Sequence, residues 1–280
     1  MAEVRVAEHA GACYGVERAL ELAWAAVDSS DDDICTLGPL IHNPRVVSSL
    51  DAMGAHVVER VEDASGRTLI LRTHGVTPDE ERRARELCPK VIDATCPFVK
   101  RVHVEVERLT RDGYEVVIVG ESGHPEVVAT LGHAPGAHII SNALEVPYAQ
   151  LGNRVGIVVQ TTLTQAVLQS VVSAIDDGTR EVKLVNTICE ATALRQAAAS
   201  QLAAASDAMV VIGGRNSANS THLAEICGGI CPRTYHIEDA SELDPAWFAD
   251  TESIGITAGA STPASQLKAV HDAILHMVQE

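Results

Sequence analysis

The stretch KVIDATCPFVKRVHVEVERL, from Lys90 to Leu109, contains the plan on which the whole fold is built. A short β-branched run ends in Asp93, small residues follow, and Cys96 stands directly before a proline. Proline is favoured at the first position of a helix, so the apolar pattern that follows predicts a helix that begins beside Cys96. A helix N-terminus lowers the pKa of a thiol and favours the thiolate, which is the form that binds metals. One such cysteine is more often inert packing, so its meaning depends on whether the arrangement recurs.

The arrangement recurs twice. The run VKLVN leads into TICEATALRQAAASQL, and VRVA near the N-terminus leads into EHAGACYGVERALELAWAAV. Each copy is a strand, a loop of small or polar residues, one cysteine and an amphipathic helix, so Cys13, Cys96 and Cys189 occupy equivalent places. Ligands of open parallel sheets bind beyond the carboxyl ends of the strands. We therefore expect three thiolates to be delivered to one centre.

The rest of the chain follows the same plan. Short β-branched runs alternate with helical patterns, which predicts an α/β fold with parallel strands. The expected strands lie near residues 4–7, 34–37, 56–59, 68–72, 90–93, 115–120, 138–141, 154–160, 182–186, 208–213, 233–237 and 253–258. They form three groups of four if the N-terminal strand completes the last group. The prediction is three pseudo-symmetric lobes, each a small, mostly parallel four-stranded sheet with flanking helices, over residues 14–97, 98–190, and 191–280 with 1–13.

Composition excludes several classes of partner. The 280 residues include 21 Lys and Arg against 38 Asp and Glu, a formal charge of −17, which argues against binding to nucleic acid or to an anionic membrane. No apolar run approaches the roughly 20 residues of a membrane span, and the N-terminus lacks a signal-peptide pattern, so we expect a cytoplasmic protein. Seven cysteines without an export signal do not indicate a disulfide framework.

Polar loops follow the first and third strands of each group. GPLIHN, THGV and GHPE place His42, His74 and His124 after strands, where a binding role is favoured over a structural one. Glu126 falls where a helix begins, and it is either a first-turn residue that complements the helix dipole or a proton donor. GRNSANS is either a capping loop or, with Ser217 and Asn219, a phosphate site. No Walker or dinucleotide-binding glycine motif is present.

Three thiolates without an obvious fourth protein ligand limit the kinds of metal site that the chain could form. Structural zinc uses four ligands, and catalytic zinc usually takes histidine or carboxylate. A 4Fe–4S cluster is normally held by four cysteines, so three leave one iron open for a substrate oxygen. The other four cysteines are interpreted as packing residues: Cys35, Cys88, Cys227 and Cys231. The C-x-x-x-C pattern of the last two is only a weak indication of a metal site.

With these motifs assembled, the chain resembles the hydroxymethylbutenyl diphosphate reductase family (LytB/IspH) of the non-mevalonate isoprenoid route. The markers are AEHAGACYGVERA, GPLIHNP, THGV, DATCPFVKRVH, GHPEV, QTT, NTICEAT, NSANS and AGASTP, which span nearly the whole chain. The resemblance implies three lobes around a central 4Fe–4S cluster on the three repeated cysteines. It implies a diphosphate held by His42, His74, His124, Ser217, Asn219 and Ser261. It also implies that Glu126, with Thr161 beside it, delivers protons to the allylic hydroxyl.

The implied activity is that of an oxidoreductase. It converts (E)-4-hydroxy-3-methylbut-2-enyl diphosphate to isopentenyl and dimethylallyl diphosphate with two electrons, supplied by reduced ferredoxin or flavodoxin. Ala12 and Ala218 depart from the Phe and Ser of many members, and Ala218 removes one hydroxyl from the expected diphosphate site. Two alternatives stay open: a quinolinate-synthase-like, cluster-dependent dehydratase, and a non-catalytic iron–sulfur sensor.

Overall fold

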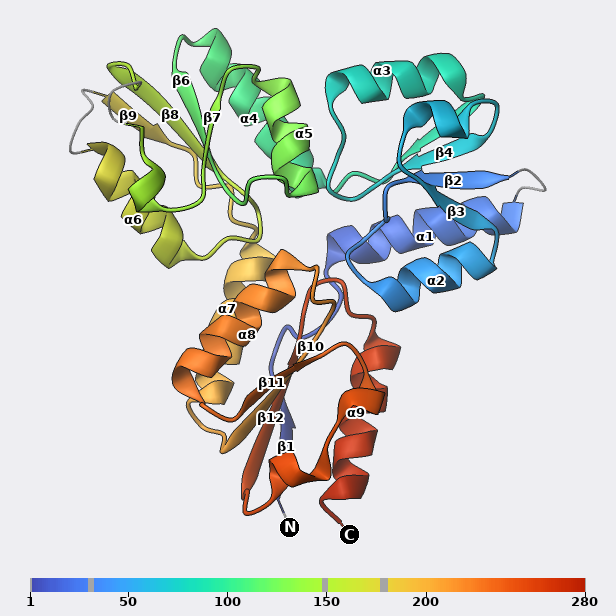
Figure 1. Ribbon diagram of the computed structural model, residues 1–280, viewed down its shortest axis with the longest axis vertical. Helices are drawn as coiled ribbons and strands as arrows, with labels where there is room; N and C mark the ends of the chain where they lie inside the picture. Colours follow the sequence, from blue (N-terminus) through green and yellow to red (C-terminus); the bar gives the residue numbers. More distant parts are fainter. Residues whose placement is uncertain (1, 30–32, 148–150, 177–180, 280) are drawn as a thin grey trace. The chain divides into compact units, whose positions relative to one another are not determined.

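Three separate parallel sheets form the framework of the protein. The computed structural model describes residues 2–29, 33–147, 151–176 and 181–279. Within these ranges twelve strands form three four-stranded sheets, and every pair of neighbouring strands is parallel (Figure 1). The predicted fold class is therefore confirmed, and each observed strand overlaps the run that predicted it.

The elements alternate along the chain as the α/β pattern requires. The strands are β1 (Glu3–Val6), β2 (Ile34–Leu37), β3 (Ala55–Val58), β4 (Thr68–Leu71), β5 (Lys90–Asp93), β6 (Glu115–Val119), β7 (His138–Ile140), β8 (Arg154–Val159), β9 (Glu181–Leu184), β10 (Ala208–Ile212), β11 (Thr234–Ile237) and β12 (Ser253–Ala258). The α-helices are α1 (Tyr14–Ser29), α2 (Pro44–Ala52), α3 (Pro78–Leu87), α4 (Pro97–Arg111), α5 (Pro125–His133), α6 (Gln165–Asp176), α7 (Glu190–Ala203), α8 (Ala218–Ile230) and α9 (Ala264–Met277).

All three sheets share one strand order. The orders are β3-β2-β4-β5, β7-β6-β8-β9 and β11-β10-β12-β1, so the N-terminal strand takes the fourth place in the last sheet, as expected. In each sheet the chain moves outward from the first strand and then returns to add the third on its other side. The loops after the first and third strands therefore flank a topological switch point, where open parallel sheets bind ligands.

Helix α4 shows how the repeated motif folds locally. Cys96 is its N-cap, Pro97 is its first residue, and it ends before Gly113, whose φ of +77° is a left-handed conformation that favours glycine. Its buried side chains recur at helical spacing: Val99, Val102, His103, Val106 and Leu109. In β8, a Cβ on Gly156 would lie 2.8 Å from a methyl of Leu109. The glycine thus lets α4 approach the sheet closely, which fixes the direction of the helix that follows Cys96.

Each face of a sheet is covered by helices and has its own apolar core. On the β6–β9 sheet, Leu168 and Val171 of α6 pack against Val117 and Ile157 on one face. Side chains of α4, such as Val106, pack on the other face. Strands buried on both faces explain why the sequence shows continuous β-branched runs rather than alternation.

The chain divides into two compact units. Unit 1 comprises Met1–Val16, His42–Pro44 and Glu190–Glu280, and unit 2 comprises Glu17–Ile41 and Arg45–Cys189. Unit 1 carries the β11-β10-β12-β1 sheet and unit 2 carries the other two sheets. The three-lobe boundaries proposed from the sequence stay a prediction.

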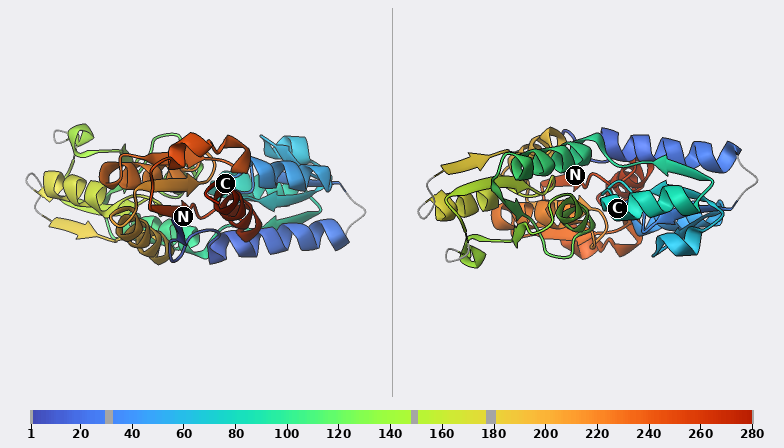
Figure 2. Two further views of the ribbon diagram at one scale, coloured as in Figure 1. Left: turned by 90° about the horizontal axis from the view of Figure 1, so that it is seen from below. Right: turned by 90° about the horizontal axis from the view of Figure 1, so that it is seen from above.

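The first and last elements meet in unit 1. Strand β1 and helix α9 lie side by side, so the N-terminal strand is held by the C-terminal part of the chain (Figures 1 and 2). None of the helices in the described ranges is long and apolar enough to cross a membrane.

Candidate active site

The three repeated cysteines occupy equivalent positions in the structure. Cys13, Cys96 and Cys189 each stand directly before the first residue of a helix, α1, α4 or α7. The backbone N–H of each donates to a carbonyl two residues beyond the third strand of a sheet. The acceptors are Ala260 for Cys13 (3.2 Å), Thr73 for Cys96 (3.0 Å) and Thr161 for Cys189 (3.0 Å). The repeat inferred from the sequence is therefore a repeat of hydrogen bonding, and it places three half-buried, reduced cysteines at helix N-termini.

The units divide these cysteines between them. Cys13 belongs to unit 1, whereas Cys96 and Cys189 belong to unit 2. Over the residues that the structure describes, no three His, Cys, Asp or Glu side chains form a group that could hold a metal ion. Thiolates that hold a 4Fe–4S cluster bind different irons, so they do not need the close spacing of ligands to a single ion.

The other four cysteines are packing residues in the core. Cys35, Cys88, Cys227 and Cys231 are all buried. Burial raises the pKa of Cys35 and Cys88, and it raises the pKa of Cys227 to about 12. These three thiols stay protonated at neutral pH, which is the opposite of what a metal ligand requires.

Glu126 is buried and points at Thr161. Its side chain is 2% exposed, although it lies in the first turn of α5, where a dipole-complementing glutamate would face solvent. Thr161 donates its backbone N–H to Glu126 Oε1 and its hydroxyl to Oε2, both at 2.7 Å. Desolvation raises the pKa of Glu126 to about 7, while the two bonds from Thr161 act in the opposite direction. Burial is therefore the cause of the raised pKa.

One residue joins this acid to a cysteine. Thr161 binds both oxygens of Glu126, and its carbonyl accepts the backbone N–H of Cys189. A buried acid and a candidate cluster ligand are thus connected through a single side chain and peptide in unit 2.

Two of the predicted histidines come together in unit 2. His124 is the N-cap of α5, and its Nδ1 accepts the backbone N–H of Glu126 at 3.2 Å. In the neutral ring the proton then lies on Nε2, which makes Nε2 a donor. The rings of His74 and His124 meet edge to face with their centroids 5.7 Å apart. The two histidines therefore lie side by side, and His124 contacts the backbone of Glu126.

Unit 1 contains the predicted serine and asparagine residues. Ser217 caps α8, and Asn219 and Ser220 lie in its first turn, all of them at most 3% exposed. Among the described residues, the amide atoms of Asn219 and the hydroxyl of Ser220 are buried without a hydrogen-bond partner. A Cβ on Gly213 or on Gly259 would lie 2.1 Å from Ser220 Oγ, so glycine is required for α8 to begin this close to both loops. Unsatisfied buried donors at a helix N-terminus are suited to an anion.

His42 reaches the same region from another part of the chain. The segment His42–Pro44 belongs to unit 1, and Asn43 donates to the carbonyl of Ser261 at 2.8 Å. Unit 1 thus brings together His42, Ser217, Asn219 and Ser261, which were predicted from loops far apart in sequence.

Sequence reasoning missed several buried polar residues around these groups. They are Asn43, His103, Gln160, Arg195 and Ser220. Gln160 accepts the backbone N–H of Glu121 and donates to Thr162, which ties together the loops of His124 and Thr161. Arg195 donates to the carbonyl of Gly11, two residues before Cys13. Asn43 lies inside the motif GPLIHNP and was open to detection, whereas Arg195 sits in a helical pattern that gives no signal.

Comparison with known proteins identifies the family. The family model described as LytB protein matches residues 4–275. The chain belongs to the LytB family. A relative from Aquifex aeolicus, named 4-hydroxy-3-methylbut-2-enyl diphosphate reductase, is 47% identical over 94% of this chain and 92% of its own length. A relative of the same name from Geobacter sulfurreducens is 44% identical over 99% of this chain and 97% of its own length.

Solved structures of LytB-family reductases share the fold. One, described as the terminal enzyme of the non-mevalonate pathway, is 45% identical, covers 99% of this chain and 100% of its own, and superposes with a TM-score of 0.73. The reductase from Plasmodium falciparum is 26% identical, covers 99% of this chain and 88% of its own, and gives a TM-score of 0.90. The resemblance inferred from the motifs is confirmed, and the family match favours the LytB reductase over a quinolinate-synthase-like dehydratase.

Proposed function

We propose that this LytB-family chain catalyses the reaction for which its relatives are named, the reduction of 4-hydroxy-3-methylbut-2-enyl diphosphate. The overall change consumes two electrons and two protons, releases the hydroxyl group as water, and yields isopentenyl or dimethylallyl diphosphate. The observation that carries the proposal is the connection Glu126–Thr161–Cys189, which joins a buried acid to a candidate cluster ligand.

Cys13, Cys96 and Cys189 would hold a 4Fe–4S cluster. They suit this group because they are free of disulfide bonds, half-buried, and each located directly before the first residue of a helix. The buried thiols elsewhere in the chain lack that environment. When bound, such a cluster supplies electrons one at a time and an iron that acts as a Lewis acid.

The diphosphate would be bound by neutral donors. Ser217, Asn219 and Ser261 are in unit 1 with His42, and His74 and His124 are in unit 2. Asn219 has an amide that no described residue satisfies, and the N-terminus of α8 favours a negative charge. Hydrogen bonds to a charged acceptor contribute about 1.5–3 kcal/mol each, so a few donors suffice without lysine.

Glu126 would supply the proton that leaves with the hydroxyl group. A pKa of about 7 keeps a substantial fraction of the carboxyl protonated at neutral pH, yet still allows it to release the proton. Thr161 donates to both carboxylate oxygens and fixes their direction. Once Glu126 has given its proton to the departing oxygen, these two bonds would stabilise the carboxylate that remains.

The electron donor is proposed from the family resemblance, and the location from the sequence. We propose reduced ferredoxin or flavodoxin as the donor, because the reaction requires successive one-electron transfers. The charge of −17 continues to argue against nucleic-acid and membrane partners. A cytoplasmic location remains a prediction.

The test is anaerobic turnover of the iron- and sulfide-reconstituted protein with the allylic diphosphate and a chemical reductant. We expect formation of the two isoprenoid diphosphates and a substrate-dependent change in the visible spectrum of the cluster. Spectral change without product would favour a sensor. A protein that holds its cluster but shows neither response would refute the proposal.

A further inference from the structure

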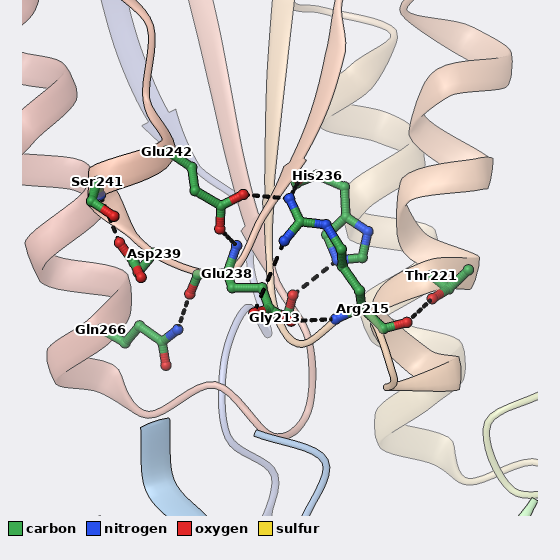
Figure 3. Close-up of polar contacts among 9 residues, drawn as sticks. All are labelled: Gly213, Arg215, Thr221, His236, Glu238, Asp239, Ser241, Glu242 and Gln266. Atoms are coloured by element: carbon green, nitrogen blue, oxygen red, sulfur yellow. Dashed lines mark hydrogen bonds and ion pairs between the residues drawn. The ribbon is translucent and has the colours of Figure 1, made fainter. Parts of the chain in front are cut away.

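The buried amide of Asn43 and the half-buried amide of Gln266 form a hydrogen-bonded pair next to Ser261 of the proposed anion site. Asn43 is 2% exposed, and its Nδ2 donates both to the carbonyl of Ser261 at 2.8 Å and to Gln266 Oε1 at 3.0 Å. Gln266 lies in the first turn of α9 and donates its Nε2 to the carbonyl of Glu238 (Figure 3). A carbonyl can only accept, so this contact fixes the orientation of the Gln266 amide and turns Oε1 toward Asn43.

Gln266 is connected through Glu238 to the loop that leads to Ser217. The carboxylate of Glu238 accepts the backbone N–H of Arg215 at 2.8 Å, and the guanidinium of Arg215 pairs with Glu242 (Figure 3). Glu242 in turn accepts the backbone N–H of Glu238 at 2.7 Å. The loops after β10 and β11 are thereby held together at Glu238, the residue that Gln266 contacts.

The backbone of His42 is held against the same loop. A Cβ on Gly214 would lie 2.8 Å from the carbonyl oxygen of His42, so the glycine allows direct contact between the two chain segments. Asn43 immediately follows and is anchored to the loop after β12. His42 therefore enters unit 1 with its peptide fixed by one loop and its neighbour fixed by another.

We propose that Asn43 and Gln266 are positioning residues for the diphosphate site, acting as one amide relay that sets the places of His42 and Ser261 relative to Ser217. This inference rests on the proposed function, because it assumes that these residues bind the diphosphate. Neither amide needs to touch the ligand. Both amides act through side chains that contact the ligand. A displacement of about 1 Å in those side chains lowers the binding affinity, because the donors must meet charged oxygens at hydrogen-bond distance.

The relay predicts a specific pattern of binding losses. Hydrogen-bond partners that orient metal ligands typically cost about 10- to 100-fold in affinity when they are removed, and we expect a similar factor for these two amides. Asn43→Ala and Gln266→Ala should each weaken the binding of inorganic pyrophosphate to the cluster-loaded protein by about that factor and raise KM, with kcat and iron content within a few-fold of wild type. Because the two residues act as a unit, the double variant should lose little more than the more damaging single change.

The experiment is calorimetric titration of each variant with pyrophosphate, with iron content and thermal stability measured on the same samples. Gln165→Ala is the matched control, since Gln165 is an exposed amide in the first turn of α6 after another third strand, and it should bind as wild type does. If Asn43→Ala fails to fold, Gln266→Ala and the isosteric Gln266→Glu test the relay from its other end. Wild-type affinity in the Gln266 variants would overturn the inference, while additive losses would overturn the single relay. No binding to wild type would overturn the proposed anion site itself.

Discussion

Replacing Glu126 with glutamine separates the proton of this residue from its packing. The amide has the shape of the protonated acid, its oxygen can accept the backbone N–H of Thr161, and its NH₂ group can donate to the Thr161 hydroxyl. Both 2.7 Å contacts of the wild type therefore have counterparts in Glu126→Gln. What the variant lacks is the ability to ionise and to give up a proton.

The raised pKa makes this change stabilising at high pH. Burial raises the pKa of Glu126 from an ordinary 4.5 to about 7, so the folded protein binds this proton more tightly than the unfolded chain does. The stabilisation is complete below pH 4.5 and is lost as the pH rises through 7. Between pH 5 and pH 8 the wild type should lose about 2–3 kcal/mol of unfolding free energy that Glu126→Gln retains. Thermal unfolding of cluster-free samples at both pH values measures this difference.

The Glu126→Gln change should lower turnover, although it raises stability at high pH. A positioned general acid contributes about 10² to 10⁴ in rate, so kcat of Glu126→Gln should fall by that factor while substrate binding and iron content persist. In the wild type, kcat should decline as the pH rises above 7, because the protonated acid disappears. Anaerobic assays with one reductant at several pH values check both statements.

A control glutamate tests the helix-dipole alternative. Glu81 lies in the first turn of α3, which also begins with proline, and its Gln variant should cost about 0.3–1 kcal/mol of stability without changing turnover. If Glu126→Gln behaves like Glu81→Gln, with turnover within a few-fold of wild type and no pH-dependent gain in stability, the proton-donor reasoning is refuted.

Three further predictions follow from the same geometry. Serine in place of a proposed cluster ligand (Cys13, Cys96 or Cys189) should abolish bound iron and visible absorbance. Serine in place of a core cysteine (Cys35, Cys88, Cys227 or Cys231) should leave the iron content near wild type. Full iron in Cys189→Ser would contradict the proposed ligand set. Ser217→Ala or Asn219→Ala should weaken substrate binding by about 1.5–3 kcal/mol with the cluster intact, as measured by KM and by the substrate-induced spectrum. Gly259→Ala should displace the start of α8, since its Cβ would lie 2.1 Å from Ser220 Oγ, and lowered thermal stability with lost pyrophosphate binding would register this; unchanged affinity would show that the loop adapts.

The sequence determined the elements and their order. Strands buried on both faces require continuous apolar β-branched runs, and parallel connections require a helix between them, so both leave a mark within a few residues of each element. The three cysteines were detectable for the same reason, because strand, loop, cysteine and helix are neighbours along the chain. The position of the loops indicated binding roles for most of the polar site residues, and the family motifs then specified a diphosphate as their ligand and added Ser261 to the set.

The tertiary structure decided the chemical state of the candidate site. The pKa of Glu126 depends on desolvation and on Thr161, which lies 35 residues away in the chain. The partners of Asn43 are Ser261 and Gln266, more than two hundred positions distant. A Cβ at position 213 or 259 would collide with the hydroxyl of Ser220, which approaches both glycines. Desolvation and close contact are properties of atoms brought together from distant segments, and a local pattern of residues does not record them.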